Sequence, residues 1–329
     1  MTSAVIFRAP GVVEFVEISV SDPGPGEVQV RTDASAISAG TEKWFLIDEF
    51  TWRPTPFPCI PGYQRVGTIT ALGEGVTGWR VGERVAATRS SSAGDLGLVS
   101  GSHAALSNSP AAELFRLRPE IPDADAAACV TGQVGYNAAS RIVGDVGDWV
   151  VVFGDGIIGQ LASQAARARG FRTVLVGRRA DRMSIAERHS ADSVLDSRTP
   201  GLAEAVMRLT DGAAITAVID TIQTEAAQAQ YIELLEAPGG QVVYSGHSPG
   251  RAWADMSLLQ QREVTAHFVS GWRRDRIEAT LEQFASGGMS FSALVTHVVP
   301  AERAPEIYQD ILTGADGYMG IVLDWRALD

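Results

Sequence analysis

A glycine-rich turn between an apolar strand and a helix constrains the fold of this chain more than any other feature. The run DWVVVFG (148–154) predicts a short buried strand, and GIIGQLASQAARARG (156–170) has helical spacing that ends at a glycine. Gly154, Gly156 and Gly159 form a G-x-G-x-x-G pattern between them. The first glycine permits a tight turn, the second lets the backbone approach a pyrophosphate, and the third allows close helix–strand packing.

The same turn predicts where phosphates would bind. A helix N-terminus, here at Ile157 and Ile158, offers free N–H groups and a partial positive charge to an anion. We therefore expect a dinucleotide site at this turn. A glycine turn in an α/β sheet with no ligand is the alternative.

The end of the next strand indicates which dinucleotide is bound. Enzymes that bind NAD usually carry Asp or Glu there, about twenty residues on, for the ribose 2′-OH. This chain has Gly177 at that point, followed by Arg178 and Arg179, with Arg182 close behind. Because a guanidinium pairs with a 2′-phosphate and a carboxylate repels it, the sequence predicts NADPH. A solvated pair of surface arginines is the alternative.

Strands and helices alternate around this turn and predict a doubly wound parallel sheet. The expected strands after it are TVLVG, SVLD, AVIDT and GGQVVYSG, and DRMSIAERHS is an expected helix. The first ~120 residues instead carry short alternating runs between turn clusters, which favours a small barrel or sandwich. The last segments are too short to stand alone, so we expect them to return to the first domain. The expected boundaries are 1–125 with 273–329 for the first domain, and 126–272 for the dinucleotide-binding domain.

Composition and charge exclude several classes of protein. The 329 residues carry 27 Lys and Arg against 39 Asp and Glu, a net charge of −12, which disfavours nucleic-acid and anionic-membrane binding. The two cysteines, Cys59 and Cys129, cannot form a zinc ribbon or a disulfide framework. The N-terminus has no signal-peptide pattern, and no apolar run is long enough to span a membrane. We therefore expect a cytoplasmic enzyme of two domains.

With these features in place, the chain resembles the medium-chain dehydrogenase/reductase superfamily over essentially its full length. The resemblance rests on PGPGEV (23–28), GWRVGERV (78–85) and the glycine fingerprint. It implies a GroES-like β-barrel catalytic domain beside a Rossmann doubly wound sheet, and a segment around Gly246 that closes over the nicotinamide. SAGTEK (38–43), PGYQRVG (61–67) and LDWR (323–326) look like the bacteriochlorophyllide a dehydrogenase subgroup. The superfamily's pairing of the last cofactor-sheet strand, here 262–271, implies a homodimer.

The chain departs from the zinc-dependent members of that superfamily. Those members carry Cys where Ser38 stands, and Gly-His-Glu where Gly62, Tyr63 and Gln64 stand. They carry a third ligand near 130–131, and the nearby Cys129 is out of step with it. A catalytic zinc needs about three Cys, His or carboxylate ligands, so we expect no metal.

The resemblance leaves hydroxyl groups as the catalytic equipment. Thr41 matches the superfamily's proton-relay Ser or Thr, and Tyr63 replaces a zinc ligand and is expected to donate a proton to the acceptor. A tyrosine that only fills the vacated space is the alternative for Tyr63. Gln64 and Lys43 are expected to be structural. An aromatic group predicts either a substrate pocket or plain core; its members are Trp44, Phe45, Trp52 and Phe57.

Two other functions remain open at this point. Gly246-His247-Ser248-Pro249-Gly250 matches G-x-S-x-G, which indicates a serine hydrolase with Ser248 as nucleophile, although such a turn needs a helix directly after it. A protein that binds NADPH without catalysis is the other. Among reactions, we favour hydride transfer from NADPH to an activated C=C, imine or ketone in specialised metabolism. The subgroup resemblance implies interconversion of a secondary alcohol and a ketone instead.

Overall fold

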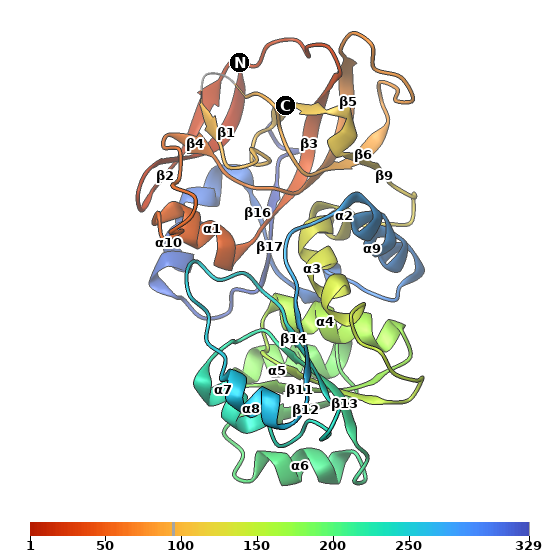
Figure 1. Ribbon diagram of the computed structural model, residues 1–329. Coiled ribbons are helices and arrows are strands. Elements are labelled where there is room, and N and C mark those ends of the chain that lie inside the picture. The colour runs from red at the N-terminus through yellow and green to blue at the C-terminus, as the bar shows by residue number, and fades with distance from the viewer. Residues whose placement is uncertain (94–95, 329) are drawn as a thin grey trace. The chain divides into compact units, whose positions relative to one another are not determined.

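The computed structural model describes residues 1–93 and 96–328. The chain divides into two units, Met1–Val130 with Val295–Asp329, and Thr131–Leu294 (Figure 1). The expected domains differ from this division mainly in residues 273–294, which belong to the second unit. Helix α9 (Arg274–Ser286) explains the difference, because it packs closely against Gly132 of the second unit. The approach is so close that a Cβ added to Gly132 would lie 2.4 Å from the Phe284 ring.

The second unit is built on a six-stranded sheet in which every pairing is parallel. The strand order is β12-β11-β10-β13-β14-β15, so successive strands are added toward one edge from β10 to β12 and toward the other edge from β13 to β15. This confirms the doubly wound parallel sheet. The strands are β10 (Trp149–Phe153), β11 (Arg172–Gly177), β12 (Ser193–Asp196), β13 (Ile215–Asp220), β14 (Gln241–Tyr244) and β15 (Thr265–Phe268).

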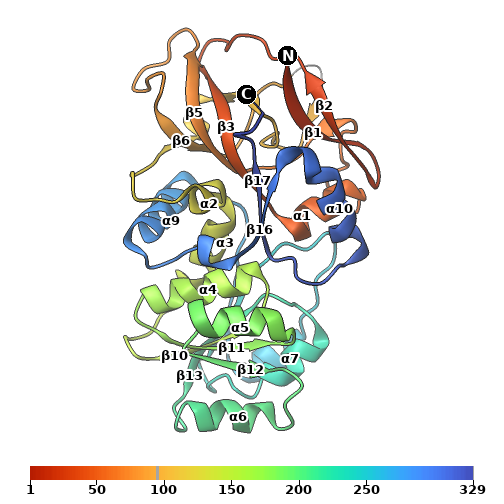
Figure 2. The same ribbon diagram turned by 180° about the vertical axis from the view of Figure 1, so that it is seen from behind.

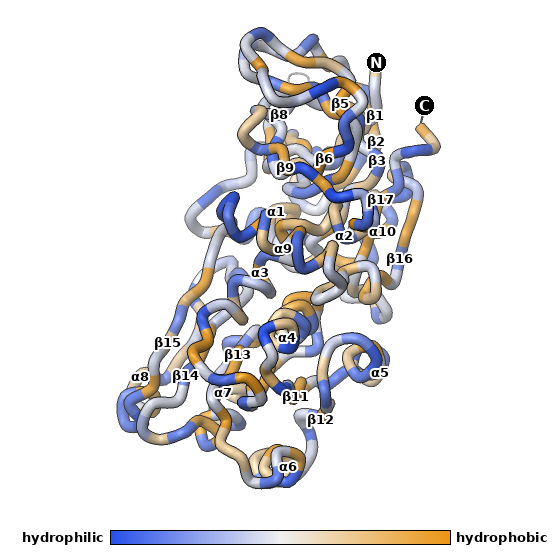
Figure 3. Tube along the Cα trace, turned by 90° about the vertical axis from the view of Figure 1, so that its right-hand side faces the viewer, coloured by the Kyte–Doolittle hydropathy of each residue, from blue (hydrophilic) through white to orange (hydrophobic). Residues whose placement is uncertain are grey.

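Helices cover both faces of this sheet. Helices α4 (Ile157–Ala168) and α5 (Ala180–His189) lie on one face, and α6 (Leu202–Leu209) and α7 (Glu225–Tyr231) lie on the other (Figure 2). Helix α6 mixes hydrophobic and hydrophilic residues and buries only one side (Figure 3). The remaining helices are α3 (Cys129–Ala139), α8 (Met256–Gln261), α9 and the short turn η2 (Ser292–Leu294).

The first unit is β-rich. One sheet has the order β16-β17-β3-β5-β6-β9, with β8 also paired to β3, and a smaller sheet has the order β2-β1-β4-β7. The C-terminal strands do return to this unit, because β17 pairs antiparallel with β3. The larger sheet contains β3 (Glu27–Ile37), β5 (Arg65–Leu72), β6 (Arg84–Ala87), β8 (Leu106–Pro110), β9 (Leu114–Arg116), β16 (Val295–Pro300) and β17 (Gly320–Asp324). The smaller sheet contains β1 (Thr2–Ala9), β2 (Val12–Ile18), β4 (Cys59–Ile60) and β7 (Gly97–Leu98).

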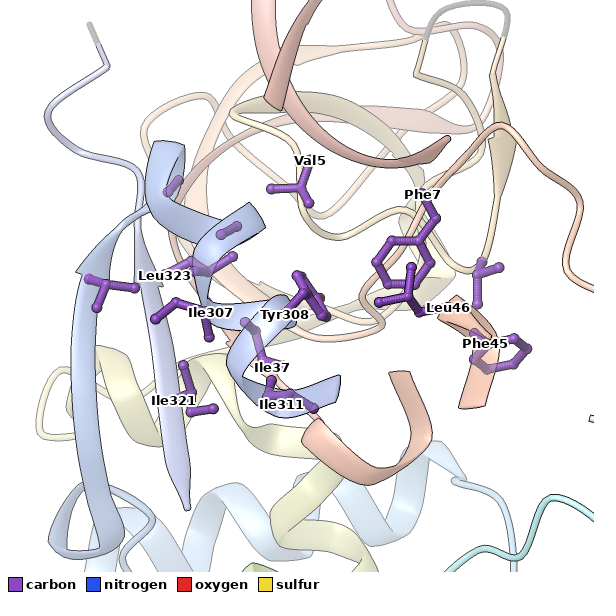
Figure 4. Close-up of a cluster of buried hydrophobic side chains, with 14 of the residues drawn as sticks. Val5, Phe7, Ile37, Phe45, Leu46, Ile307, Tyr308, Ile311, Ile321 and Leu323 are labelled. Carbon is purple, nitrogen blue, oxygen red and sulfur yellow. The ribbon is translucent and has the colours of Figure 1, made fainter. Parts of the chain in front are cut away.

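A hydrophobic core joins the N-terminal and C-terminal parts of this unit. Tyr308, on α10 (Ala304–Thr313), packs edge-on against the Phe7 ring within this core, with 5.1 Å between the two ring centroids (Figure 4). Phe45, on α1 (Ala39–Leu46), belongs to the core, whereas Trp52 is 58% exposed. The four predicted aromatics therefore do not form one pocket wall. The other helical segments of this unit are α2 (Asp123–Ala127), η1 (Ala111–Glu113) and η3 (Ala301–Arg303).

Candidate cofactor and catalytic sites

The glycine turn after β10 has the geometry that its pattern predicts. Gly154 has φ +120°, and a Cβ there would lie 2.1 Å from the Thr221 hydroxyl. A Cβ on Gly159 would lie 2.0 Å from the Gly154 carbonyl oxygen, so helix α4 packs directly onto the turn. At Gly156, the N-cap of α4, a Cβ would meet only an Arg182 nitrogen, at 3.8 Å.

The N-terminus of α4 is suited to a phosphate. Its N-cap, Gly156, supplies no side chain to the first turn, in which Ile157 and Ile158 are half-buried. The N–H groups of that turn therefore have no capping side chain and present a partial positive charge. The backbone fits the pyrophosphate of a dinucleotide.

The end of β11 brings the predicted arginines next to an acidic residue that belongs to the glycine turn. Asp155 is 9% exposed, and its Oδ2 accepts hydrogen bonds from the backbone N–H groups of Arg178 and Arg179 at 2.6 and 2.8 Å. Arg182, on α5, has Nη1 4.0 Å from Asp155 Oδ1. Arg178 and Arg179 are exposed, and Arg182 is half-buried.

Gly246 lies just after the carboxyl end of β14. Its carbonyl oxygen accepts a hydrogen bond from Gln223, which follows the neighbouring strand β13. Gly246 has φ +102°, and Gln223 Nε2 donates to the carbonyl oxygens of Ser245 and Gly246 at 3.1 and 3.3 Å. Gln223 itself has φ +58°, and its backbone N–H donates to Asp220 Oδ1. Burial raises the pKa of Asp220, with the hydrogen bonds from Gln223, Ile222 and Tyr231 acting against it.

Tyr63, in the first unit, follows a glycine that is packed against an imidazole. Gly62 has φ +85°, and a Cβ there would lie 2.7 Å from the His103 ring. The backbone N–H groups of His103 and Ser102 donate to the carbonyl oxygens of Pro61 and Gly62, which fixes the segment before Tyr63. The Tyr63 side chain is half-buried.

Thr41 precedes a buried glutamate that joins several polar side chains. Glu42 Oε2 accepts from His103 Nε2 at 3.0 Å and from the Tyr308 hydroxyl, and Oε1 accepts from the Ser38 backbone N–H at 2.9 Å. Burial, and next the negative charge of Glu42, raise the pKa of Tyr308 well above its usual value, and Tyr63 adds a smaller effect. Tyr308 is therefore a protonated donor. His103 lies outside the strands and is part of this network.

The network has a defined direction of donation. The Trp325 indole N–H, which can only donate, bonds to Ser35 Oγ at 2.8 Å, and Ser35 Oγ lies 2.8 Å from His103 Nδ1. Because a carboxylate only accepts, we assign the His103 proton to Nε2, which faces Glu42, and this leaves Nδ1 to accept from Ser35. The Glu42 carboxylate thus accepts hydrogen bonds from His103, Tyr308 and the Ser38 backbone.

The residues that stand at the superfamily's zinc positions are poor ligands for zinc. Gln64 is fully buried, and its amide donates to the Ala36 carbonyl oxygen. Burial raises the pKa of the Cys59 and Cys129 thiols to about 12, so neither is a thiolate. Among residues 1–93 and 96–328, no three His, Cys, Asp or Glu side chains are grouped to hold a metal ion.

The turn around Ser248 does not have the geometry of a hydrolase nucleophile. Such a serine needs a helix immediately after its turn. Here the next helix, α8, begins only at Met256. The G-x-S-x-G match is therefore coincidental.

Comparison with known proteins decides the family. The description "Alcohol dehydrogenase GroES-like domain" matches residues 24–119, and "Zinc-binding dehydrogenase" matches residues 158–286. The chain is also 26% identical, over 99% of both chains, to the 2-desacetyl-2-hydroxyethyl bacteriochlorophyllide A dehydrogenase of Cereibacter sphaeroides. The chain belongs to the medium-chain dehydrogenase/reductase superfamily. As a member of it the protein is an oxidoreductase, and the expected GroES-like and Rossmann fold class is confirmed.

Solved structures share the fold of this medium-chain dehydrogenase/reductase at lower identity. A protein from Sinorhizobium meliloti 1021 bound to NADP superimposes with a TM-score of 0.85 at 21% identity, covering 98% of this chain and 99% of its own. A short chain alcohol dehydrogenase from E. coli CFT073 complexed with NADH gives 0.84 at 19% identity and the same coverage. In the described residues, no helix has both the length and the apolar character to span a membrane.

Sequence reasoning missed residues that the structure places beside the predicted ones. Asp155 occupies a variable position of the fingerprint, and Glu42 directly follows Thr41. Only contacts between distant segments reveal Gln223 and Tyr308. A signal was available for Asp155 alone, because an acidic side chain inside a phosphate-binding turn is unfavourable unless another group holds it.

Proposed function

We propose that this oxidoreductase binds NADPH and reduces an activated small-molecule acceptor, such as a conjugated C=C, an imine or a ketone, in specialised metabolism. When bound, the nicotinamide supplies a hydride. The observation that carries the proposal is the end of β11, where Gly177 stands in place of an acid and Arg178 and Arg179 follow, both exposed. The solved relatives with NADP and NADH support a pyridine nucleotide.

The residues of the second unit have separate tasks in this proposal. Gly154, Gly156 and Gly159 shape the turn, and the first turn of α4, with Ile157 and Ile158, holds the pyrophosphate. The guanidinium groups of Arg178 and Arg179 pair with the 2′-phosphate. Arg182 contributes less than the sequence suggests, because Asp155 shares its charge. Gly246 belongs to the turn beside the nicotinamide half.

The residues of the first unit supply the proton. We assign this role to Tyr63, with Thr41 as the relay, and expect no zinc to assist them. Hydride addition leaves negative charge on the acceptor, and one well-placed hydrogen-bond donor stabilises such a charge by about 3 kcal/mol, as in oxyanion holes. Hydrogen-bond donors can do this without a metal when the acceptor is already activated. The protein would work in the cytoplasm on a small molecule.

A second reaction is favoured by one observation. The similarity to the bacteriochlorophyllide dehydrogenase over the whole chain supports oxidation of a secondary alcohol, the reverse of ketone reduction. The same Thr41 and Tyr63 would then accept the proton rather than donate it. If the substrate is a ketone, the same site can catalyse both its reduction and the oxidation of the resulting alcohol. If the substrate is a conjugated C=C, the oxidation of a secondary alcohol is not the reverse reaction.

Removal of one arginine tests the cofactor assignment. Arg178→Ala should weaken NADPH binding roughly ten- to a hundredfold, the effect of losing a charged hydrogen bond of about 1.5–3 kcal/mol. NADH binding should stay almost unchanged. Fluorescence titration of both cofactors provides the measurement, and Arg188→Ala, which removes an exposed arginine from the same helix region, is the control. Equal affinity of the unmutated protein for both cofactors would refute the assignment.

A further inference from the structure

We propose that Asp155 sets the discrimination between a 2′-hydroxyl and a 2′-phosphate, as an acid moved from the end of β11 into the glycine turn. The inference rests on the proposed dinucleotide site and deepens it. It assigns to Asp155 the task that a carboxylate at position 177 performs in NAD-binding enzymes.

The first argument is the space beside Gly177. A Cβ on Gly177 would lie 2.7 Å from the Asp155 Cβ and 3.0 Å from Asp155 Oδ2. The third neighbour is Met183 Cγ at 2.9 Å. An acidic side chain at 177 and the one at 155 would therefore occupy the same space. The carboxylate of Asp155 stands where the usual acid would project.

The second argument is the way this carboxylate is held. Its Oδ2 accepts both backbone N–H groups, from Arg178 and Arg179, at 2.6 and 2.8 Å. These are the amides that open the segment after β11, so the acid is tied to that segment and is oriented without help from solvent. Its Oδ1 lies 4.0 Å from Nη1 of the Arg182 guanidinium. Because Oδ2 already accepts two hydrogen bonds, we assign to Oδ1 the hydrogen bond from a ribose hydroxyl.

The third argument is charge. Two exposed guanidinium groups, of Arg178 and Arg179, attract a 2′-phosphate, whereas Asp155 repels it and neutralises part of Arg182. The two backbone amides that would otherwise bind a phosphate are already taken by Asp155 Oδ2. The net preference for NADPH is therefore smaller than the arginines alone would give. Asp155 keeps NADH binding available to the same site.

Asp155→Asn tests this assignment with little structural change. Because both amides bond to one oxygen, the carbonyl of asparagine can keep both bonds. We expect NADPH and 2′,5′-ADP to bind roughly three- to tenfold more tightly, since one negative charge near the phosphate is removed. NADH should bind equally or more weakly. The ratio of the two cofactor dissociation constants is the readout, measured by fluorescence titration.

Asp181→Asn is the matched control, because it removes the same charge from an exposed residue in the first turn of α5. It should move the ratio far less than Asp155→Asn. If Asp155→Asn leaves the ratio at its wild-type value, or moves it as little as the control does, the inference is overturned.

A double variant covers the case in which Asp155→Asn fails to fold. Asp155→Gly combined with Gly177→Asp returns the acid to β11 and removes the Asp155 side chain that it would meet, so that only Met183 must shift. The double variant should restore the wild-type ratio that Asp155→Gly alone loses, and failure to restore it counts against the inference. Failure of the proposed function is a separate result. Wild-type protein would then prefer NADH, yet Asp155→Asn would still move the ratio toward NADPH.

Discussion

Tyr63 shows how a single reactive residue depends on buried polar neighbours. The absence of a side chain at Gly62 leaves room for the His103 ring, and Glu42 and Ser35 contact that ring at its two nitrogens. Burial of a carboxylate is costly unless donors surround it, and Glu42 has three. The network therefore satisfies the buried Glu42 and positions the segment that precedes Tyr63.

Removal of the Tyr63 hydroxyl tests its role. Tyr63→Phe should lower turnover at least tenfold, because general acid catalysis contributes about 10²–10⁴-fold. NADPH binding should stay intact, since the hydroxyl is not assigned to the cofactor. Thr41→Ala should lower turnover less severely. The measurement is steady-state NADPH oxidation with a panel of enones, quinones and ketones.

Two controls complete this experiment. Elemental analysis should find far less than one zinc per chain, and a chelator should leave turnover unchanged, so that the effect is assigned to the hydroxyl. Full turnover by Tyr63→Phe with the best acceptor would leave Tyr63 as a residue that only fills space. The proton would then come from Thr41 or water.

At the scale of elements, the sequence predicts the second unit better than the first. The fingerprint and its flanking strand and helix are local, so β10, α4 and β11 follow from residues within about thirty positions. Helix α6 is not among the expected helices, although its buried residues Leu202, Ala205 and Val206 stand at helical spacing. The hydrogen bonds from Arg178 and Arg179 to Asp155 could not be predicted either, since they join segments that only the fold brings together.

The carboxyl ends of β13 and β14 are joined by one strained residue, and this predicts an order of stabilities. Gln223 has a left-handed backbone, which costs a non-glycine residue about 1–3 kcal/mol, and its amide makes two hydrogen bonds of about 0.5–1.5 kcal/mol each. Gln223→Ala loses the bonds and keeps the strain, whereas Gln223→Gly loses both. Gln223→Ala should therefore be the less stable variant, by about 1 kcal/mol or more.

Urea unfolding of the wild type and both variants measures this difference. The comparison between the two variants is its own control, because each removes the same amide. Equal stability of the two variants would show that the backbone at Gln223 is unstrained. A loss of hydrogen-exchange protection at the Ser245 amide, which donates to the Asp220 carbonyl oxygen beside this turn, would place the effect there if it occurs in both variants.

At the scale of the whole molecule, the first unit is assembled from both ends of the chain. Lys43 Nζ donates to the carbonyl oxygens of Ile311 and Leu312, at the C-terminal end of α10. A cation there also favours the helix dipole. Together with the pairing of β17 and β3, this contact ties residues almost three hundred positions apart. The sequence predicts such a return only from the small size of the last segments.

The open edge of the second unit's sheet predicts how two chains meet. Strand β15 ends the strand order, and the backbone N–H groups of Thr265 and Val269 donate toward β14. Backbone N–H groups of successive strand residues point alternately to the two edges of the strand. The N–H groups of Ala266 and Phe268 therefore point away from β14, toward the open edge. Phe268 is 69% exposed. An edge of this kind pairs with another chain unless it is protected, and a two-fold axis lets it pair with its own copy.

We therefore expect a homodimer, with a mass twice 34.9 kDa in light scattering at micromolar concentration. Phe268→Lys should shift the mass to that of one chain, because a charge on an edge strand blocks pairing of strands. Val146→Lys replaces another exposed apolar residue of the same unit, 84% exposed, with the same charge and should leave the dimer intact. A monomer mass for the wild type would contradict the prediction. Loss of the dimer in both variants would show that added charge, and not the β15 edge, controls assembly.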